Sequence, residues 1–138
     1  QYSLEDIRKE DIMIFPGGMP GTSNLAACTP LMNKMQRHFA EGGKVAAICA
    51  APGFVLSQLP LEEVIKANGG LRMASYEGCE NPLLEKGVTV IDPRQGVIAD
   101  SNIISASGPG HAVAFGLKIL EHIAGSKTAD TVAKALML

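Results

Sequence analysis

The chain has 138 residues, of which 46% are hydrophobic and 19% charged, and its formal net charge is −2 at pH 7. A chain of this size buries roughly two-thirds of the surface that its unfolded form exposes, so residues 1–138 are expected to form a single domain without disulfides or metals. The balanced charge excludes the basic footprint of a nucleic-acid partner. No apolar run approaches the roughly 18 residues of a membrane span, so we expect no membrane partner.

The three cysteines, Cys28, Cys49 and Cys79, are odd in number and irregularly spaced. Such a set argues against a disulfide framework, and no Cys-x-x-Cys pair indicates zinc. We therefore expect neither a metal nor another cofactor. Free cysteines, together with the lack of a signal-peptide pattern, favour a reducing, cytoplasmic location.

The first part of the chain contains one strand pattern and one short helix pattern. The apolar burst over residues 11–15 predicts a strand, which Pro16-Gly17-Gly18 ends. Thr22 or Ser23 can then cap a short helical turn over residues 24–28. Glycines directly after a strand let the backbone approach a ligand or another loop closely, so residues 16–18 are a candidate binding loop.

The middle of the chain continues the alternation. Thr29-Pro30 provides an N-cap followed by proline at the first helical position, and apolar residues at helical spacing extend this helix to Ala40. A short buried strand is predicted over residues 45–48. Two helices are predicted after it, over residues 51–59 and 61–67.

The second half consists of short apolar segments separated by turns rich in glycine and proline. These segments predict strands over residues 71–75, 88–92, 97–99 and 103–106. Two helices close the chain, one over residues 111–124 and one over residues 128–136, where Thr128 is the expected cap. The first of these helices is expected to bury Val113, Leu117, Leu120 and Ile123. His38 and His122 lie within predicted helices and are expected on the surface.

Strand–helix alternation with glycine-rich turns predicts a mostly parallel sheet covered by helices on both faces. Ligands bind such sheets outside the carboxyl ends of the strands. Three candidate loops follow predicted strands: residues 16–18, residues 49–50 and residues 107–110. We expect these loops to meet at one site.

Cys49 occupies the most distinctive position in the sequence. A buried strand ends there, and a helix begins within a few residues, with Pro52 tolerated in its first turn because the missing N–H would be unpaired anyway. A sharp strand-to-helix turn lifts a side chain toward the helix N-terminus, whose partial positive charge favours thiolate over thiol. This is the arrangement of a nucleophile elbow with cysteine in place of serine. The alternative is a buried structural cysteine that packs as a small hydrophobe.

Taken together, the three loops resemble motifs of the ThiJ/PfpI superfamily, in particular its parkinsonism-associated deglycase branch. The matching segments, in the family's order, are Ile14-Phe15-Pro16-Gly17-Gly18, Val45-Ala46-Ala47-Ile48-Cys49-Ala50-Ala51-Pro52 and Ser107-Gly108-Pro109-Gly110. The resemblance implies a flavodoxin-like, three-layer α/β sandwich with a mostly parallel sheet and helices on both faces. It also implies a homodimer.

The resemblance assigns roles to several residues. Cys49 matches the family's reactive, easily oxidised cysteine, and Gly18 and Ala50 match the backbone N–H donors of an oxyanion pocket. The residues expected to line that pocket are Gly17, Tyr76, Gly108, Pro109 and His111. Tyr76 falls where some members carry a histidine and others an aromatic residue.

Two of these assignments leave alternatives open. His111 could act as a general base only if it reached Cys49, and otherwise it is a solvent-facing residue of the first helical turn. Cys79, which lies in a polar loop near Tyr76, is either an accessory thiol or an ordinary loop residue.

Two departures from the family's pattern affect the expected chemistry. Ala50 follows the cysteine where the protease-like branch has a histidine, so no Cys–His pair is encoded there. The family also has a further N-terminal strand–helix–strand region of about 50 residues. That region carries a glutamate that contacts the cysteine. We expect a separate N-terminal segment or fragment to complete the fold and to supply this acid/base residue.

These considerations lead to three functional hypotheses. The first is a cysteine-dependent glyoxalase or deglycase-like enzyme that acts on small reactive carbonyls such as methylglyoxal or its adducts. The second is a non-catalytic, chaperone-like sensor of oxidative stress that uses the oxidisable Cys49. The third is a cysteine peptidase or amidase, which the absence of a histidine after Cys49 disfavours.

Overall fold

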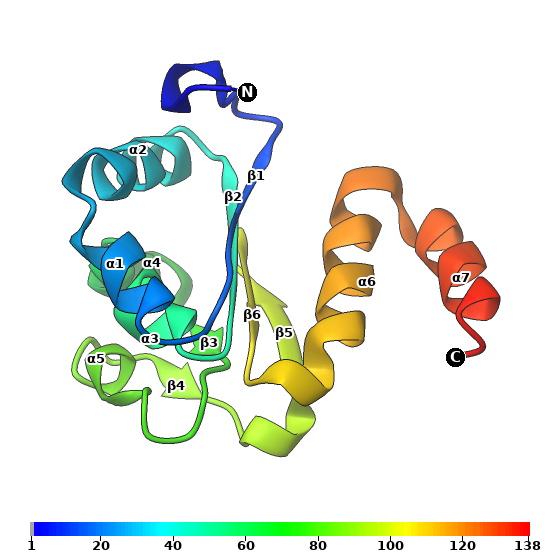
Figure 1. Cartoon of the computed structure of the whole chain (residues 1–138). Helices are drawn as coiled ribbons and strands as arrows, with labels where there is room; N and C mark the ends of the chain where they lie inside the picture. The colour runs from blue at the N-terminus through cyan, green and yellow to red at the C-terminus, as the bar shows by residue number, and fades with distance from the viewer. Residues whose placement is uncertain (1) are drawn as a thin grey trace.

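The computed structural model describes residues 2–138 and contains a four-stranded sheet of order β1-β2-β6-β5 (Figure 1). The strands are β1 (Ile12–Phe15), β2 (Lys44–Ile48), β5 (Val97–Asp100) and β6 (Ile103–Ala106). β1, β2 and β6 are parallel, whereas β5 forms an antiparallel hairpin with β6. A second, two-stranded parallel sheet pairs β3 (Arg72–Met73) with β4 (Thr89–Val90).

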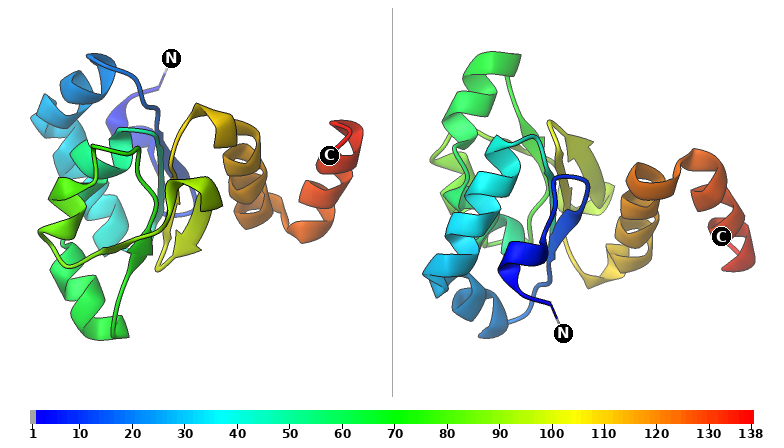
Figure 2. Two further views of the ribbon diagram at one scale, coloured as in Figure 1. Left: turned by 90° about the horizontal axis from the view of Figure 1, so that it is seen from below. Right: turned by 90° about the horizontal axis from the view of Figure 1, so that it is seen from above.

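Helices cover both faces of the main sheet, which confirms the predicted three-layer, mostly parallel α/β fold (Figure 1). The helices on one face are α1 (Gly21–Ala27), α2 (Thr29–Ala40), α3 (Ala51–Phe54), α4 (Leu61–Asn68) and α5 (Asn81–Leu84). The other face carries α6 (Ala112–Ala124), which lies between the sheet and α7 (Ser126–Ala135) (Figure 2). Four short 3₁₀ turns complete the part of the chain that the structure describes: η1 (Leu4–Asp6), η2 (Leu56–Gln58), η3 (Pro93–Gln95) and η4 (Pro109–His111).

The alternation of side chains along β2 divides the core in two. Val45 and Ala47 contribute to the larger cluster, which includes buried residues from β1, α2, η2 and β3. Ala46 and Ile48 face the smaller cluster, where Phe115 of α6 packs. Successive residues of a strand point to opposite faces, so a strand covered on both sides is apolar at nearly every position, as residues 45–48 are.

The register of the parallel strands aligns their carboxyl ends. Phe15 pairs with Ala47, and Ile48 pairs with Ala106. Residues 16–18, 49–50 and 107–110 therefore leave the sheet at the same edge, as predicted. The hairpin from β5 to β6 turns at Ser101 and Asn102, whose φ values of 53° and 64° are those of a two-residue hairpin turn.

The helix around Thr22 begins earlier than predicted. α1 starts at Gly21 with Pro20 at the N-cap, and Thr22 is buried inside the first turn without making a capping hydrogen bond. The Thr22 N–H donates to the Gly18 carbonyl at 2.8 Å, so helical hydrogen bonding starts directly after the glycine loop. Similarly, the N-cap of α2 is Cys28, and Thr29 is already helical.

The predicted helix over residues 51–59 is two short elements, α3 and η2. In η2 the hydrogen bonds span three residues, for example from the Leu59 N–H to the Leu56 carbonyl at 3.0 Å. The Gln58 side chain donates to the Ala26 carbonyl at 3.0 Å, which ties this segment to the end of α1. Tertiary contacts of this kind override the helical pattern of the sequence.

The strands predicted over residues 71–75 and 88–92 are shorter than expected because their hydrogen bonds lead elsewhere. After Met73, the Ala74 N–H donates to the Ser105 hydroxyl of β6 at 2.8 Å instead of to β4. Two residues later, the Tyr76 N–H donates to the Cys49 carbonyl at 2.9 Å. The chain is thereby drawn toward the end of β2.

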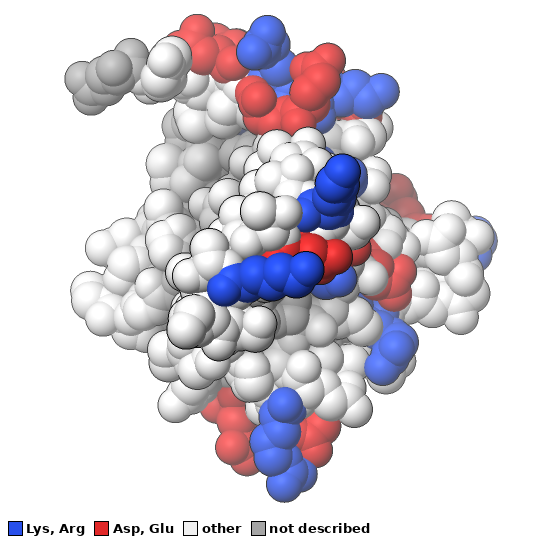
Figure 3. All heavy atoms as spheres, turned by 90° about the vertical axis from the view of Figure 1, so that its right-hand side faces the viewer, with Lys and Arg blue, Asp and Glu red and all other residues white. Residues whose placement is uncertain are grey.

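The buried face of α6 differs from the prediction. Phe115 and Ile119 are buried, whereas Val113 and Ile123 are 54% and 65% exposed. Apolar residues cover a wide part of the surface of α6, on every face except that of Lys118, Glu121 and His122, so the sequence pattern alone does not identify the stripe that faces the sheet. The α6–α7 side faces the viewer in Figure 3, where uncharged side chains cover most of the surface. The last helix also starts before the predicted cap, with Gly125 at its N-cap position.

His38 was expected on the surface but is only 2% exposed. It continues the buried stripe of α2 that begins at Met32 and Met35. Its Nε2 lies 3.0 Å from the Lys44 carbonyl oxygen, so the ring is buried with a hydrogen-bond partner. His122 is exposed, as expected.

The two histidines provide a matched test of this packing. We expect His38→Ala to lower the free energy of unfolding by about 1–3 kcal/mol, because the buried hydrogen bond and the ring packing are both lost. His122→Ala should change it by less than about 0.5 kcal/mol, since the side chain is exposed. Urea unfolding curves of the two variants measure the difference, and equal effects would contradict the assigned burial.

Candidate functional site

Cys49 is held in an unusual backbone conformation at the end of β2. Its φ is +66°, a value that costs of order 1–3 kcal/mol for a non-glycine residue and is concentrated at functional sites. The Cys49 N–H donates to the Ala106 carbonyl at 2.9 Å and its carbonyl accepts from the Tyr76 N–H at 2.9 Å. α3 begins two residues later. The chain therefore makes a sharp strand-to-helix turn at Cys49, and hydrogen bonds fix the residue on both sides.

The glycine loop after β1 packs directly against this turn. A Cβ on Gly17 would lie 2.5 Å from the Cys49 Cβ, 2.9 Å from the Ile48 carbonyl oxygen and 3.3 Å from the Cys49 Sγ. Only glycine permits so close an approach. The side of Cys49 that faces β1 is thus closed by the Gly17 backbone.

Gly18 and Ala50 have N–H groups without a backbone acceptor among residues 2–138. Their carbonyl groups are engaged, because Gly18 accepts from Thr22 at 2.8 Å and Ala50 accepts from Phe54 at 3.1 Å. In a trans peptide the N–H of Ala50 points opposite to the Cys49 carbonyl, and hence away from Tyr76. Two unpaired donors therefore flank the cysteine, one from each neighbouring loop.

A separate hollow of about 280 Å³ lies beside the turn that follows β6. Three of the predicted pocket residues, Tyr76, Gly108 and His111, line it together. The other lining residues are Glu77, Pro93, Arg94, Ser107 and Gly110. Pro109 does not line this hollow, and Gly17 lies against Cys49 instead.

His111 is directed toward the β5 side of this hollow. Its ring occupies the space that a side chain on Gly96 would need. No hydrogen bond joins His111 to Cys49 within the described residues. The structure therefore gives no direct contact through which His111 could act as a base on the cysteine.

Arg94, at the mouth of the same hollow, was not identified from the sequence. Its guanidinium group forms an exposed ion pair with Asp92 at 2.8 Å. Hydrogen bonds from Arg94 lower the pKa of Asp92 to about 2. The sequence predicts only a turn over residues 93–96, and nothing in that pattern indicates that the arginine lies near Tyr76.

Cys79 lies close to Cys49, a proximity that sequence spacing could not reveal. Burial raises the pKa of the Cys79 thiol, and the neighbouring Cys49 and Glu80 raise it further. The Cys79 carbonyl oxygen occupies the space where a side chain on Gly53 would lie. The loop that carries Cys79 is thus packed on the first turn of α3.

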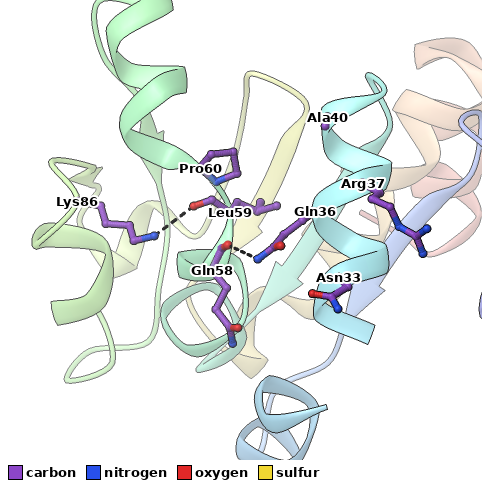
Figure 4. A pocket seen from close by; sticks show the side chains of 8 residues that line it. All are labelled: Asn33, Gln36, Arg37, Ala40, Gln58, Leu59, Pro60 and Lys86. Atoms are coloured by element: carbon purple, nitrogen blue, oxygen red, sulfur yellow. Dashed lines mark hydrogen bonds between the residues drawn. The ribbon is translucent and has the colours of Figure 1, made fainter. Parts of the chain in front are cut away.

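A larger hollow lies elsewhere, between α2 and the Leu59–Pro60 segment (Figure 4). It measures about 840 Å³. Two of its polar side chains already donate hydrogen bonds, since Lys86 Nζ contacts the Leu59 carbonyl at 3.2 Å and Gln36 Nε2 contacts the Gln58 carbonyl at 2.9 Å. None of the three strand-end loops lines this hollow, so we do not assign the chemistry to it.

No group of three or more His, Cys, Asp or Glu side chains among residues 2–138 is arranged to hold a metal ion. None of the helices in the described part of the chain is long and apolar enough to cross a membrane.

Comparisons with known sequences identify relatives along nearly the whole chain. The model of the DJ-1/PfpI family matches residues 1–122. The chain is 32% identical over 133 residues to Protein dj-1beta of Drosophila melanogaster, which covers 94% of this chain and 65% of that protein. It is 30% identical over 138 residues to Glutathione-independent glyoxalase DJR-1.2 of Caenorhabditis elegans, covering 99% of this chain and 68% of that protein. Only 31% of Protein DJ-1 homolog A of Arabidopsis thaliana is matched, at 32% identity over 128 residues.

Solved structures agree with this relationship. The crystal structure of Drosophila melanogaster DJ-1beta has a TM-score of 0.77 at 29% identity, over 98% of this chain and 67% of that one. Oxidized Toxoplasma gondii DJ-1 has a TM-score of 0.78 at 25% identity, over 97% and 66%. The chain thus spans about two-thirds or less of the length of these relatives. Sequence, motifs and fold agree, and the chain belongs to the DJ-1/PfpI family.

Proposed function

We propose that this protein is a cysteine-dependent enzyme of the glyoxalase or deglycase type that acts on small reactive carbonyls such as methylglyoxal or its adducts. The observation that carries the proposal is the strained backbone of Cys49 beside the unpaired N–H groups of Gly18 and Ala50. A relative with 30% identity is named as a glutathione-independent glyoxalase. Cys49 and the two N–H groups are the nucleophile and the oxyanion donors that such an activity needs in this chain.

In the first step, the Cys49 thiolate adds to the aldehyde carbon of methylglyoxal and forms a carbon–sulfur bond. The carbonyl electron pair moves to oxygen, and the resulting alkoxide accepts hydrogen bonds from the Gly18 and Ala50 N–H groups. Donors fixed before the reaction stabilise such a charge without reorganisation, and one such donor contributes roughly 100- to 1,000-fold in rate in known enzymes. Protonation of the alkoxide gives a hemithioacetal on Cys49.

In the second step, an acid/base group moves the hydrogen of the former aldehyde carbon to the adjacent ketone carbon. The product is a lactoyl thioester on Cys49, which water hydrolyses to lactate and free thiolate. The overall change adds one water to methylglyoxal, so the reaction needs no external oxidant or reductant. We propose that the acid/base is the glutamate of a further N-terminal segment, as the family resemblance implies.

The free edge of β1 supports the presence of such a segment. β1 is an edge strand, and Ile14 at its centre is 51% exposed. A groove of about 360 Å³ runs along it, with apolar walls that include Ile7 and Leu25. An unpaired, apolar strand edge is a template for another strand. The relatives are longer than this chain, which is consistent with a further strand at this edge.

We also propose a homodimer in a reducing, cytoplasmic setting. The exposed Val113 and Ile123 on the α6–α7 side offer apolar surface for association. The three cysteines are free thiols, a state that reducing compartments maintain.

The nucleophile assignment can be tested by substitution. In the protein together with any polypeptide that co-purifies with it, Cys49→Ser should lower kcat/KM for lactate formation from methylglyoxal at least about 1,000-fold, because serine lacks an ionised nucleophile at neutral pH. Cys28→Ser is the matched control and should keep wild-type turnover, since Cys28 lies between α1 and α2. Unchanged turnover in Cys49→Ser would contradict the mechanism.

A second pair of variants tests how closely the glycine loop positions the cysteine. Gly17→Ala places a methyl group 2.5 Å from the Cys49 Cβ. The displacement of Cys49 should lower turnover by roughly 100-fold, as misplacements of about 1 Å can do. Gly21→Ala meets no atom within 4 Å and should leave turnover unchanged. Thermal unfolding confirms that both variants fold, and equal turnover in the two would count against a positioned Cys49.

The missing carboxylate can be tested by analysis of the native protein. Mass spectrometry of the complex purified from its natural source should reveal either a longer polypeptide or a second one, with a glutamate required for turnover. A lone species with the mass of these 138 residues that converts methylglyoxal would show that the acid/base lies within this chain.

A further inference from the structure

We propose that Cys79 is a resolving thiol for Cys49, so that a hydroperoxide converts the pair into an intramolecular disulfide and stops turnover reversibly. The inference rests on the proposed function only in requiring a reactive Cys49. It adds a regulatory step that depends on a second residue, and that residue takes no part in the carbonyl chemistry.

The backbone of the Cys79 loop is attached directly to Cys49. The Tyr76 N–H donates to the Cys49 carbonyl at 2.9 Å, and the Cys79 N–H donates to the Tyr76 carbonyl at 2.9 Å. The second bond closes a four-residue turn with Gly78, at φ +91°, in its third position. The turn reverses the chain and brings Cys79 back toward Cys49, whose carbonyl accepts the hydrogen bond from Tyr76.

Cys79 is also packed against the helix that starts after Cys49. Its carbonyl oxygen lies against Gly53 of α3, which has no side chain to keep it away. α3 begins at Ala51, only two residues after Cys49. Two independent contacts, one to the Cys49 carbonyl and one to the first turn of α3, thus hold the Cys79 loop beside the cysteine.

The electrostatics assign different roles to the two thiols. Burial, the charge on Cys49 and the charge on Glu80 all raise the pKa of Cys79. A raised pKa leaves less thiolate at neutral pH, so Cys79 is a poor first target for a peroxide. Cys49 is the first target, since the unpaired N–H groups of Gly18 and Ala50 flank it and can stabilise negative charge that develops there.

The chemistry balances with a hydroperoxide as the only oxidant. The Cys49 thiolate attacks the terminal peroxide oxygen, the O–O bond breaks, and Cys49 becomes a sulfenic acid while the alcohol or water leaves. The Cys79 sulfur then attacks the Cys49 sulfur. The S–O bond breaks, the thiol proton leaves with the hydroxide as water, and the disulfide forms. Each peroxide consumes two thiols, and a dithiol reductant restores both.

Cys28 cannot replace Cys79 in this scheme. It lies at the junction of α1 and α2, is exposed, and is not among the charges that act on Cys79. It therefore serves as the control cysteine.

The test exposes the protein, with any co-purifying polypeptide, to equimolar hydrogen peroxide at pH 7, followed by alkylation and mass spectrometry of a non-reduced digest. We expect a cross-linked pair of peptides that contain Cys49 and Cys79, with a mass loss of about 2 Da. Methylglyoxal turnover should fall to background and return after treatment with dithiothreitol. Cys28→Ser should give the same result.

Removal of Cys79 should change the product and its reversibility. When Cys79→Ser and Cys79→Ala are treated with more than two equivalents of hydrogen peroxide, one for the sulfenic and one for the sulfinic step, Cys49 should gain about 32 Da as a sulfinic acid, which dithiothreitol does not reduce. Sulfinic acid on Cys49 of the wild type, with Cys79 still open to alkylation, would overturn this inference and leave the proposed function intact. Oxidation of Cys28 or Cys79 ahead of Cys49 would overturn both. A cross-link to Cys28, or between two chains, would also refute the pairing.

Discussion

The site depends on one constraint, the shared register of three parallel strands. Because Phe15 pairs with Ala47 and Ile48 pairs with Ala106, β1, β2 and β6 end together. The loops that follow must then occupy a single small region. The hydrogen bond from Cys49 to Ala106 extends the ladder by one residue beyond β2, and the φ of +66° is the consequence of turning into α3 immediately afterwards. Strain at the cysteine is thus maintained by ordinary sheet pairing on one side and by the Tyr76 N–H on the other.

Much of this arrangement could be predicted from the sequence, because its signals are local. Proline and glycine after apolar runs mark the ends of the strands, and the position of Cys49 between a strand and Pro52 indicates the turn. Alternation of strands and helices predicts the three layers. Each of the three loops follows a strand of one parallel set. Parallel strands end at the same edge of a sheet, so the loops are expected at that edge.

Other features could not be predicted because they depend on contacts between distant segments. His38 follows Met32 and Met35 at helical spacing, but its burial also needs a hydrogen-bond partner for the ring, and that partner, the Lys44 carbonyl, lies outside α2. The buried stripe of α6 is ambiguous because apolar residues cover all of this helix except the face of Lys118, Glu121 and His122. Cys79 lies near Cys49 because the N–H of Tyr76, which is 27 positions after Cys49, donates to the Cys49 carbonyl. The turn that begins at Tyr76 then leads to Cys79. At each of these positions the local sequence is compatible with more than one structure, and contacts with distant segments determine which one forms.

The most direct measurement is the rate at which iodoacetamide labels each of the three cysteines, with and without methylglyoxal. Cys28 is exposed, whereas Cys49 and Cys79 are only partly so. If the strand-to-helix turn activates Cys49, it should be labelled first in spite of its lower exposure, and methylglyoxal should slow its labelling alone. If Cys28 is labelled first and methylglyoxal protects no cysteine, reactivity simply follows exposure, and Cys49 is not the centre of the site.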